Sequence, residues 1–233
     1  MQSGRKSDGM NPVKFLWSRV PEAFDAWQPS YESDASRMIE KRGYSYRRMA
    51  DEILATLALN AGHPKRVLEI GTGTGNLGME VLATNKSITA IGIDISTRMA
   101  AAAAARGIYS GVVRASVEQI PFPEETFDAI FTAFVLHSVW DQIRAMREIR
   151  RVLRPGGRVA LSDLCPVRRS MVVGTTLGLF HALVREYGAP ARFRRVDEYV
   201  RISVELGFEV TAVRPLGGPR RYMHFLVGLQ KVR

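Results

Sequence analysis

Hydrophobic positions from Arg66 onward form short apolar runs that alternate with segments in which apolar residues recur every three or four positions. Apolar runs of about 5 to 6 residues predict strands, and recurrence at helical spacing predicts helices between them. This alternation is typical of an open parallel sheet covered by helices on both faces. The expected strands are 66–71, 88–95, 111–116, 127–136 and 158–164, the expected helices are 76–85, 97–107 and 140–153, and a turn is expected at 154–157.

The two ends of the chain add further elements. Segments 33–43 and 44–62 have helical periodicity, and the second is expected to stop at Gly62. Near the C-terminus, a helix at 196–207 precedes two apolar runs that are joined only by the Gly-Gly-Pro connection at 217–219. Because no crossover helix fits into that connection, the two runs should form antiparallel strands. These strands are expected at 207–216 and 221–232.

The pattern as a whole predicts one α/β domain with appendages. We expect residues 1–62 to form an N-terminal helical cap and residues 63–233 to form the main domain. The segment at about 166–190 interrupts the alternation with an apolar stretch and then a polar one, so it reads as an insertion.

The composition supports a buried core and raises the question of an anionic partner. Hydrophobic residues make up 46% of the chain, whose net charge is +10 at pH 7. Nucleic acid, an anionic membrane surface or an acidic substrate would explain this charge, and so would surface arginines without a partner. The single cysteine, Cys165, excludes an intrachain disulfide. The chain starts without the apolar core of a signal peptide, and its apolar stretch at 171–184 is shorter than the ~20 residues of a membrane span, so we expect a cytoplasmic protein.

The stretch VLEIGTGTGNL, residues 67–77, places three glycines at alternate positions directly after the first strand. In an open α/β sheet, this first strand-to-helix turn lies beside the ligand. A dinucleotide site with the pattern G-x-G-x-x-G/A would require a small residue at position 76, where Asn76 stands. The loop therefore indicates a ligand other than a dinucleotide.

The spacing Glu69-x-Gly71-x-Gly73-x-Gly75 resembles motif I of class I S-adenosylmethionine-dependent methyltransferases. By this resemblance, the bare backbone of Gly71 and Gly73 lies against the methionine part of the cofactor, where a Cβ would collide. The same resemblance implies that Glu69 orders the loop and the ammonium end of the cofactor. Asp94, at the end of the second strand, stands at the spacing of an acid that binds ribose hydroxyls.

Two further blocks resemble the same family. In RASVEQIPFP, the residues Ser116 and Val117 stand where the family has an Asp-Ala pair, so the acid that usually accepts the adenine amino group is replaced by a serine. EIRRVLRPGGRVALSDL resembles the branch of small-molecule enzymes related to ubiquinone and menaquinone biosynthesis methyltransferases. The resemblance runs from about Arg66 to Asp163. It implies a Rossmann-like, mostly parallel seven-stranded sheet of order 3-2-1-4-5-7-6 with the last-formed strand antiparallel, and a substrate lid at about 166–190.

The resemblance also implies the residues of the site. S-adenosyl-L-methionine is the expected cofactor. Its expected binding residues are Glu69, Gly71, Gly73, Gly75, Asp94, Ile95, Met99, Ser116, Val117, Phe134 and Tyr46.

Catalytic residues are harder to identify, because methyl transfer requires a base only when the bound nucleophile carries a proton. His137 follows the fourth strand and should face the cleft, either as a base or as a pocket residue. Tyr31 lies in FDAWQPSYES, which resembles the family's opening segment, and His181 lies in the predicted lid. For Tyr31 and Tyr46, packing in the core is the alternative to a role in the site. A plain structural helix at about 166–190 would have much the same sequence pattern as a lid.

These patterns predict methyl transfer to a C, N or O nucleophile of a small, partly apolar metabolite. Three alternatives stay open: a phospholipid N-methyltransferase at an anionic membrane surface, an RNA methyltransferase, and a relative that keeps the cofactor without methylating. We do not expect nucleic acid as a partner, because the segment 132–135 lacks the [DNS]-P-P-[YFW] pattern of amino-group methylation. Peripheral membrane contact is possible on charge alone, no metal site is expected, and the oligomeric state is not determined by the sequence.

Overall fold

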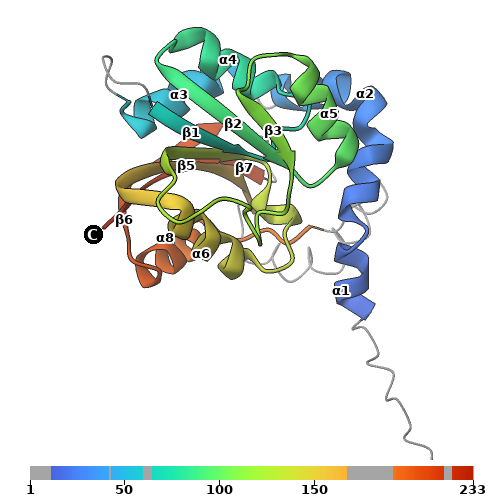
Figure 1. Ribbon diagram of the computed structural model, residues 1–233. Helices are drawn as coiled ribbons and strands as arrows, with labels where there is room; N and C mark the ends of the chain where they lie inside the picture. Colours follow the sequence, from blue (N-terminus) through green and yellow to red (C-terminus); the bar gives the residue numbers. More distant parts are fainter. Residues whose placement is uncertain (1–11, 42, 60–64, 167–190, 218–221, 233) are drawn as a thin grey trace, which may run out of the picture.

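A seven-stranded sheet is the centre of the molecule (Figure 1). The computed structural model describes residues 12–41, 43–59, 65–166, 191–217 and 222–232. The strands lie in the order β3-β2-β1-β4-β5-β7-β6, and β7 is antiparallel to both of its neighbours. This arrangement confirms the predicted Rossmann-like fold. The strands are β1 (Lys65–Ile70), β2 (Ile88–Asp94), β3 (Gly111–Arg114), β4 (Phe127–Ala133), β5 (Leu153–Pro166), β6 (Phe208–Gly217) and β7 (Tyr222–Lys231).

Helices cover both faces of this sheet. One face carries α3 (Tyr46–Leu57) and α4 (Asn76–Thr84), and the other carries α6 (Gln142–Val152) and α8 (Val196–Glu205). Helix α5 (Thr97–Ala105) packs against β2 and β3, and a 3-10 turn at Leu136–Ser138 follows β4. Each predicted helix of the central alternation is therefore present.

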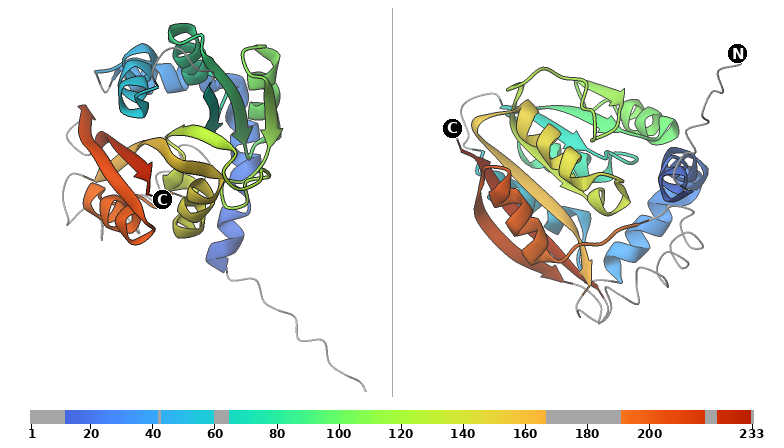
Figure 2. Two further views of the ribbon diagram at one scale, coloured as in Figure 1. Left: turned by 60° about the vertical axis from the view of Figure 1, so that its left-hand side comes forward. Right: turned by 90° about the horizontal axis from the view of Figure 1, so that it is seen from below.

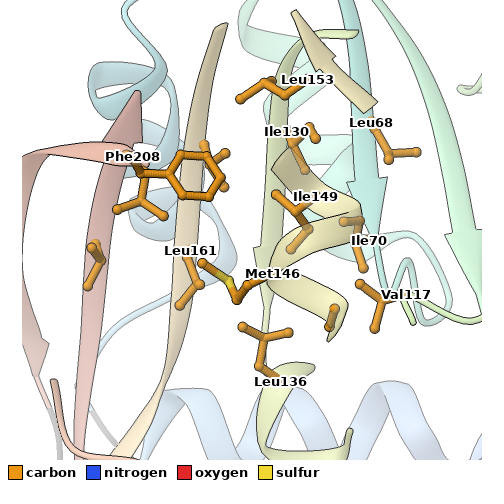
Figure 3. Packing of buried hydrophobic residues seen from close by; sticks show 14 of the residues in the cluster. Leu68, Ile70, Val117, Ile130, Leu136, Met146, Ile149, Leu153, Leu161 and Phe208 are labelled. Carbon is orange, nitrogen blue, oxygen red and sulfur yellow. The ribbon is translucent and has the colours of Figure 1, made fainter. Parts of the chain in front are cut away.

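The alternation of side chains along β1 divides the core into two clusters. Leu68 and Ile70 point toward α6 and pack in one cluster with Met146 and Ile149 (Figure 3). Val67 points to the opposite face and packs in the cluster that includes the buried side of α3 and α4. Because successive side chains of a strand point to opposite faces, Glu69 must also emerge on the side of α3 and α4.

Two N-terminal helices, α1 (Pro12–Trp17) and α2 (Val20–Glu40), lie outside the sheet, with α2 beside α5 (Figures 1 and 2). The sequence predicted only the last part of α2. The helix is difficult to recognise because it contains Pro29 and because only Val20, Ala35 and Ile39 are buried. A helix that buries so few positions lacks a strong apolar stripe.

Helix α3 ends earlier than predicted. Its last residue is Leu57, and Ala58 follows in the left-handed conformation with φ +46°, donating its N–H to the Leu54 carbonyl at 3.1 Å. A left-handed residue at this position is a common helix end, although glycine is the usual residue there. The predicted stop, Gly62, lies outside the described residues.

The predicted turn at 154–157 is an irregular part of β5. Phe127 of β4 pairs with Leu153 and Ala129 pairs with Arg158, so the intervening residues of β5 bulge out of the ladder. Gly156 has φ +74°, which a glycine adopts without strain. The chain therefore passes from α6 into the sheet through a bulge.

Candidate active site

A pocket lies at the carboxyl ends of β1 to β4, and α2 contributes to its wall. It contains about 790 Å³ of empty space, counting the part open to solvent. Ligands of open α/β sheets bind at this edge, outside the carboxyl ends of the strands. The predicted site residues that line it are Tyr31, Gly71, Gly73, Asp94, Ile95, Met99, Ser116, Val117 and Phe134.

The glycine loop has the conformation that only glycines adopt readily. Gly71, Gly73 and Gly75 all have positive φ, at +72°, +52° and +88°. A Cβ on Gly71 would overlap the Val135 side chain, and one on Gly73 would lie 3.1 Å from the Tyr31 hydroxyl oxygen. The protein itself therefore requires bare backbone at these two positions, in addition to any need of a ligand.

Asp94 is hydrogen-bonded to the backbone of this loop. Its Oδ2 accepts a hydrogen bond from the Gly73 N–H at 2.8 Å, and its Oδ1 accepts one from the Ser96 N–H at 2.9 Å. Burial raises the pKa of Asp94 to about 6, and these N–H donors oppose the increase. Ser96 caps α5 by accepting from the Met99 N–H at 3.0 Å, which leaves Asp94 available to the pocket.

Glu69 does not line the pocket. Its Oε2 accepts a hydrogen bond from the Tyr109 hydroxyl at 2.6 Å, under α4, where a Cβ on Gly78 would overlap both groups. Burial raises the pKa of Glu69 to about 8, the charge of Asp94 adds to the increase, and the Tyr109 hydrogen bond opposes it. Tyr109 precedes β3 in an irregular segment, and nothing in its sequence context indicated this contact.

Tyr46 and Gly75 also lie outside the pocket lining, in a polar network beside the loop. Arg106 donates from Nη2 to Glu32 Oε1 at 2.6 Å and to Asn76 Oδ1 at 2.5 Å. The Tyr46 hydroxyl bonds to the Asn76 side chain, and burial raises its pKa to about 12. This network connects α2 and α3 to the start of α4, so it supports the loop from outside.

Tyr31 is the residue of α2 that reaches the glycine loop. Its ring makes an edge-to-face contact with Trp27 at 4.8 Å between centroids, and burial raises the pKa of its hydroxyl. A second residue of α2, Asp25, accepts hydrogen bonds from Ser96 Oγ at 2.5 Å and from the Arg98 N–H at 2.9 Å. The sequence did not single out Asp25 as a link between α2 and α5.

The serine that replaces the family's acid forms a local turn. Ser116 Oγ accepts a hydrogen bond from the Glu118 N–H at 3.1 Å. Glu118 also lines the pocket, and its Oε1 accepts from the Asp141 N–H at 2.7 Å. Val117 is 6% exposed and lies between these two residues on the pocket wall.

His137 is held by a buried carboxylate. Its Nδ1 lies 2.6 Å from Asp163 Oδ1, and its backbone N–H donates to Asp163 Oδ2 at 3.0 Å. Asp163 also accepts from the Leu164 N–H at 2.8 Å and is fully buried at the end of β5. The imidazole stacks on Phe193 with centroids 5.0 Å apart, and Nε2 makes no hydrogen bond with the described residues.

His137 lies next to the pocket lining in the chain but is not part of it, since the pocket contacts Ser138 and Val139 instead. The histidine therefore borders the site from the side of β5. Asp163 is a partner that the sequence analysis did not name, although an acidic residue at the carboxyl end of a strand was the available signal. His181 lies outside the described residues.

The comparisons with known proteins agree with this geometry. A family profile described as "Methyltransferase domain" matches residues 68–161. A 27-O-demethylrifamycin SV methyltransferase of Amycolatopsis mediterranei is 30% identical over 196 residues, which cover 74% of this chain and 70% of the relative. The chain belongs to the class I S-adenosylmethionine-dependent methyltransferases.

A second member of this methyltransferase family is similar over a shorter region. A ubiquinone/menaquinone biosynthesis C-methyltransferase of Geobacter sulfurreducens is 29% identical over 170 residues, which cover 64% of this chain and 66% of the relative. The match thus spans just under two thirds of the length of that protein. Among solved structures, the (4+2)-cyclase SpnF superimposes with a TM-score of 0.75 over 93% of this chain and 97% of its own, at 18% identity. This last similarity shows the fold alone.

S-adenosylmethionine is the cofactor of this methyltransferase family, and the residues of the pocket fit it. The glycine loop presents bare backbone, and Asp94 presents a carboxyl at the end of β2. Asp94 and Glu69 are both buried without a cationic side chain hydrogen-bonded to them within the described residues. The cofactor carries an ammonium and a sulfonium, which would supply the missing positive charge.

Two further findings concern other kinds of site. The described residues contain no group of three or more histidine, cysteine or acidic side chains that could hold a metal ion. Of the helices in the described ranges, none has the length and apolar character needed to cross a membrane.

Proposed function

We propose that this protein transfers the methyl group of S-adenosylmethionine to a hydroxyl oxygen of a small, partly apolar molecule, with His137 as the base. The hydrogen bond between His137 and the buried Asp163 carries the proposal. A carboxylate can only accept hydrogen bonds, so Asp163 favours the tautomer in which Nδ1 carries the proton. The lone pair of Nε2 then remains available to an acceptor hydroxyl.

The reaction follows from this arrangement. Bound S-adenosylmethionine supplies a methyl group on a sulfonium, which is a good leaving group. His137 Nε2 takes the proton of the acceptor hydroxyl as the oxygen forms its bond to the methyl carbon. Asp163 stabilises the imidazolium that forms. The cofactor would supply the methyl group and keep the electron pair of its carbon–sulfur bond, so that it would leave as a neutral thioether.

Other residues of the pocket have positioning roles in this proposal. Asp94 would accept hydrogen bonds from the ribose hydroxyls, and the Val117 N–H, beside Ser116, would donate one to the adenine ring. Tyr31, which packs against Gly73, would close the methionine end. In-line transfer requires the reacting atoms to approach to roughly 3 to 3.5 Å, so these contacts contribute by orientation. His181 receives no role here.

The names of the relatives point to different acceptor atoms. One is a C-methyltransferase, and another is a 27-O-demethylrifamycin SV methyltransferase. Carbon and tertiary amine nucleophiles do not require an oriented base of this kind at the transfer step, whereas a hydroxyl does. The His137–Asp163 pair therefore favours oxygen as the atom that receives the methyl group.

The test combines cofactor binding with product analysis. Calorimetry should show binding of S-adenosylhomocysteine. Incubation with S-adenosylmethionine carrying a 13C-labelled methyl group and a panel of small phenols, alcohols, amines and quinols should place the label on oxygen. Absence of cofactor binding, or a label found only on carbon or nitrogen, contradicts the proposal.

A further inference from the structure

Two tryptophans form the end of the pocket nearest to α1. Trp17 is the last residue of α1, and Trp140 lies between the 3-10 turn and α6. Their rings meet edge to face with centroids 5.3 Å apart and planes at 61°. Both line the same pocket as Gly71 and Asp94, although neither belongs to the glycine loop or to the ends of β2 and β3.

The indole nitrogen of Trp17 is an unusual feature of this wall. Nε1 is buried, and it has no hydrogen-bond partner among the described residues. In contrast, Nε1 of Trp27, which does not line the pocket, donates to Asp34 Oδ2 at 2.9 Å. A buried donor without a partner is costly to the folded protein. Because Trp17 lines the pocket, a ligand that binds there is placed to supply an acceptor.

The tryptophan pair is attached to the segment that carries the proposed base. Trp140 is three residues after His137, and the Arg192 N–H donates to the His137 carbonyl at 2.6 Å. The Arg192 guanidinium lies 5.5 Å from the ring centroid of Trp17 and 5.2 Å from that of Trp140. Gln142 Nε2 donates to the carbonyls of Leu136 and Arg192, at 2.7 and 2.8 Å. Through Arg192, these contacts link both tryptophans to the segment that carries His137.

We propose that Trp17 and Trp140 form a subsite for a planar, conjugated part of a ligand that carries a hydrogen-bond acceptor at its edge. Aromatic faces favour planar groups, and the Trp17 N–H selects those with an oxygen or ring nitrogen in reach. The adenine ring of the cofactor and a conjugated methyl acceptor share this chemistry. Attachment to the His137 segment favours the methyl acceptor. The inference rests on the proposed function, since it assigns the substrate class of the same site.

The test uses Trp17→Phe and Trp140→Phe in the full chain, with Trp27→Phe as the matched control. Thermal unfolding checks that each variant folds, and Trp140→Phe provides the test should Trp17→Phe fail to fold. Calorimetry measures the Kd of S-adenosylhomocysteine, and then, at saturating S-adenosylhomocysteine, the Kd of 2-naphthol and of its saturated counterpart decahydro-2-naphthol. These two probes share size and hydroxyl group and differ in planarity.

We expect wild type to bind 2-naphthol more tightly than decahydro-2-naphthol. Trp17→Phe should raise the Kd of 2-naphthol about fivefold, as loss of one hydrogen bond implies. Trp140→Phe should raise it similarly, while Trp27→Phe changes nothing. Weakening of S-adenosylhomocysteine instead, with 2-naphthol unaffected or unbound, would assign the subsite to adenine. The proposal is overturned if Trp17→Phe and Trp140→Phe raise the Kd of neither ligand more than Trp27→Phe does. Failure of wild type to bind S-adenosylhomocysteine would contradict the proposed function itself.

Discussion

At the scale of single residues, His137 and Asp163 act as a pair. Asp163→Asn keeps the shape of the side chain but can donate to Nδ1, which favours the wrong imidazole tautomer. We expect His137→Gln and Asp163→Asn each to lower kcat by on the order of 10² to 10⁴, the range that removal of a general base gives. The affinity for S-adenosylhomocysteine should stay unchanged.

Steady-state kinetics with the acceptor found in the labelling experiment provides this measurement. Asp128→Asn is a matched control, because Asp128 is at the opposite end of β4 and pairs with Arg154 at 2.7 Å. Equal kcat in wild type and Asp163→Asn would exclude His137 as a base that Asp163 orients.

A second residue-scale prediction concerns the glycine loop. Gly73→Val should abolish detectable binding of S-adenosylhomocysteine, because the added side chain meets Tyr31 and a branched residue at φ +52° is strained. Gly107→Val is the control, since Gly107 also has positive φ, at +65°, but a Cβ there meets nothing within 4 Å. Calorimetry on both folded variants measures the difference. Retained binding in Gly73→Val would mean that the loop does not hold the cofactor.

At the scale of elements, the position of α2 depends on a few polar contacts. Asp25 accepts from Ser96 and Arg98 at the start of α5, and a hydrogen bond from Ser96 is the main cause of its lowered pKa. Glu32 pairs with Arg106 near the other end of α5. Since α2 buries few apolar residues, these two contacts fix it over the pocket.

We therefore expect Asp25→Ala to loosen α2 at a cost of about 1 kcal/mol, typical for loss of a helix cap. Hydrogen exchange of α2 should accelerate, and S-adenosylhomocysteine should dissociate faster, because α2 carries Tyr31 and Phe24 on the pocket wall. Glu22→Ala is the control in the same helix, since Glu22 is largely exposed and lies 4.0 Å from Arg19. Unchanged exchange in Asp25→Ala would show that apolar packing alone holds α2.

The elements themselves were largely predictable. The central strands and helices were found because their apolar periodicity extends over several residues, and antiparallel pairing of β6 and β7 followed from their short connection. The first two-thirds of α2 were missed because that helix is nearly polar and contains Pro29. The division into a cap at 1–62 and a domain at 63–233 stays a prediction, and α3 of that cap packs directly into the core of the sheet.

At the scale of the whole molecule, two buried carboxyls lie close together without a cationic partner among the described residues: Asp94 lines the pocket, and Glu69 lies behind the glycine loop under α4. The pKa of Glu69 is raised to about 8 and that of Asp94 to about 6, in both cases chiefly by burial. Groups with raised pKa in the folded state bind protons more tightly than in the unfolded chain. The stability that they contribute is fully present below their ordinary pKa values of about 4 and is lost progressively as the pH rises to the folded values of about 6 and 8.

Binding of the cofactor should oppose this trend. Its positive charges favour the ionised carboxylates, so binding releases protons, and the affinity for S-adenosylmethionine should rise between pH 6 and 8. S-adenosylhomocysteine lacks the sulfonium and should show a smaller rise. Calorimetry in buffers with different ionisation enthalpies measures the proton release, and Glu69→Gln should remove the step near pH 8. A Kd independent of pH for both ligands would contradict this account.

The sequence by itself determined the alternation of strands and helices, because this depends on local periodicity. Its resemblance to the methyltransferase family implied the strand order and the position of the glycine loop beside the cofactor. Only the tertiary structure decided that Glu69 faces Tyr109 under α4 rather than the pocket, that Asp163 holds His137, and that Trp17 meets Trp140. The two members of each pair lie at least 26 residues apart in the chain. Such contacts form only when the sheet and its covering helices bring distant segments together, and no local pattern encodes them.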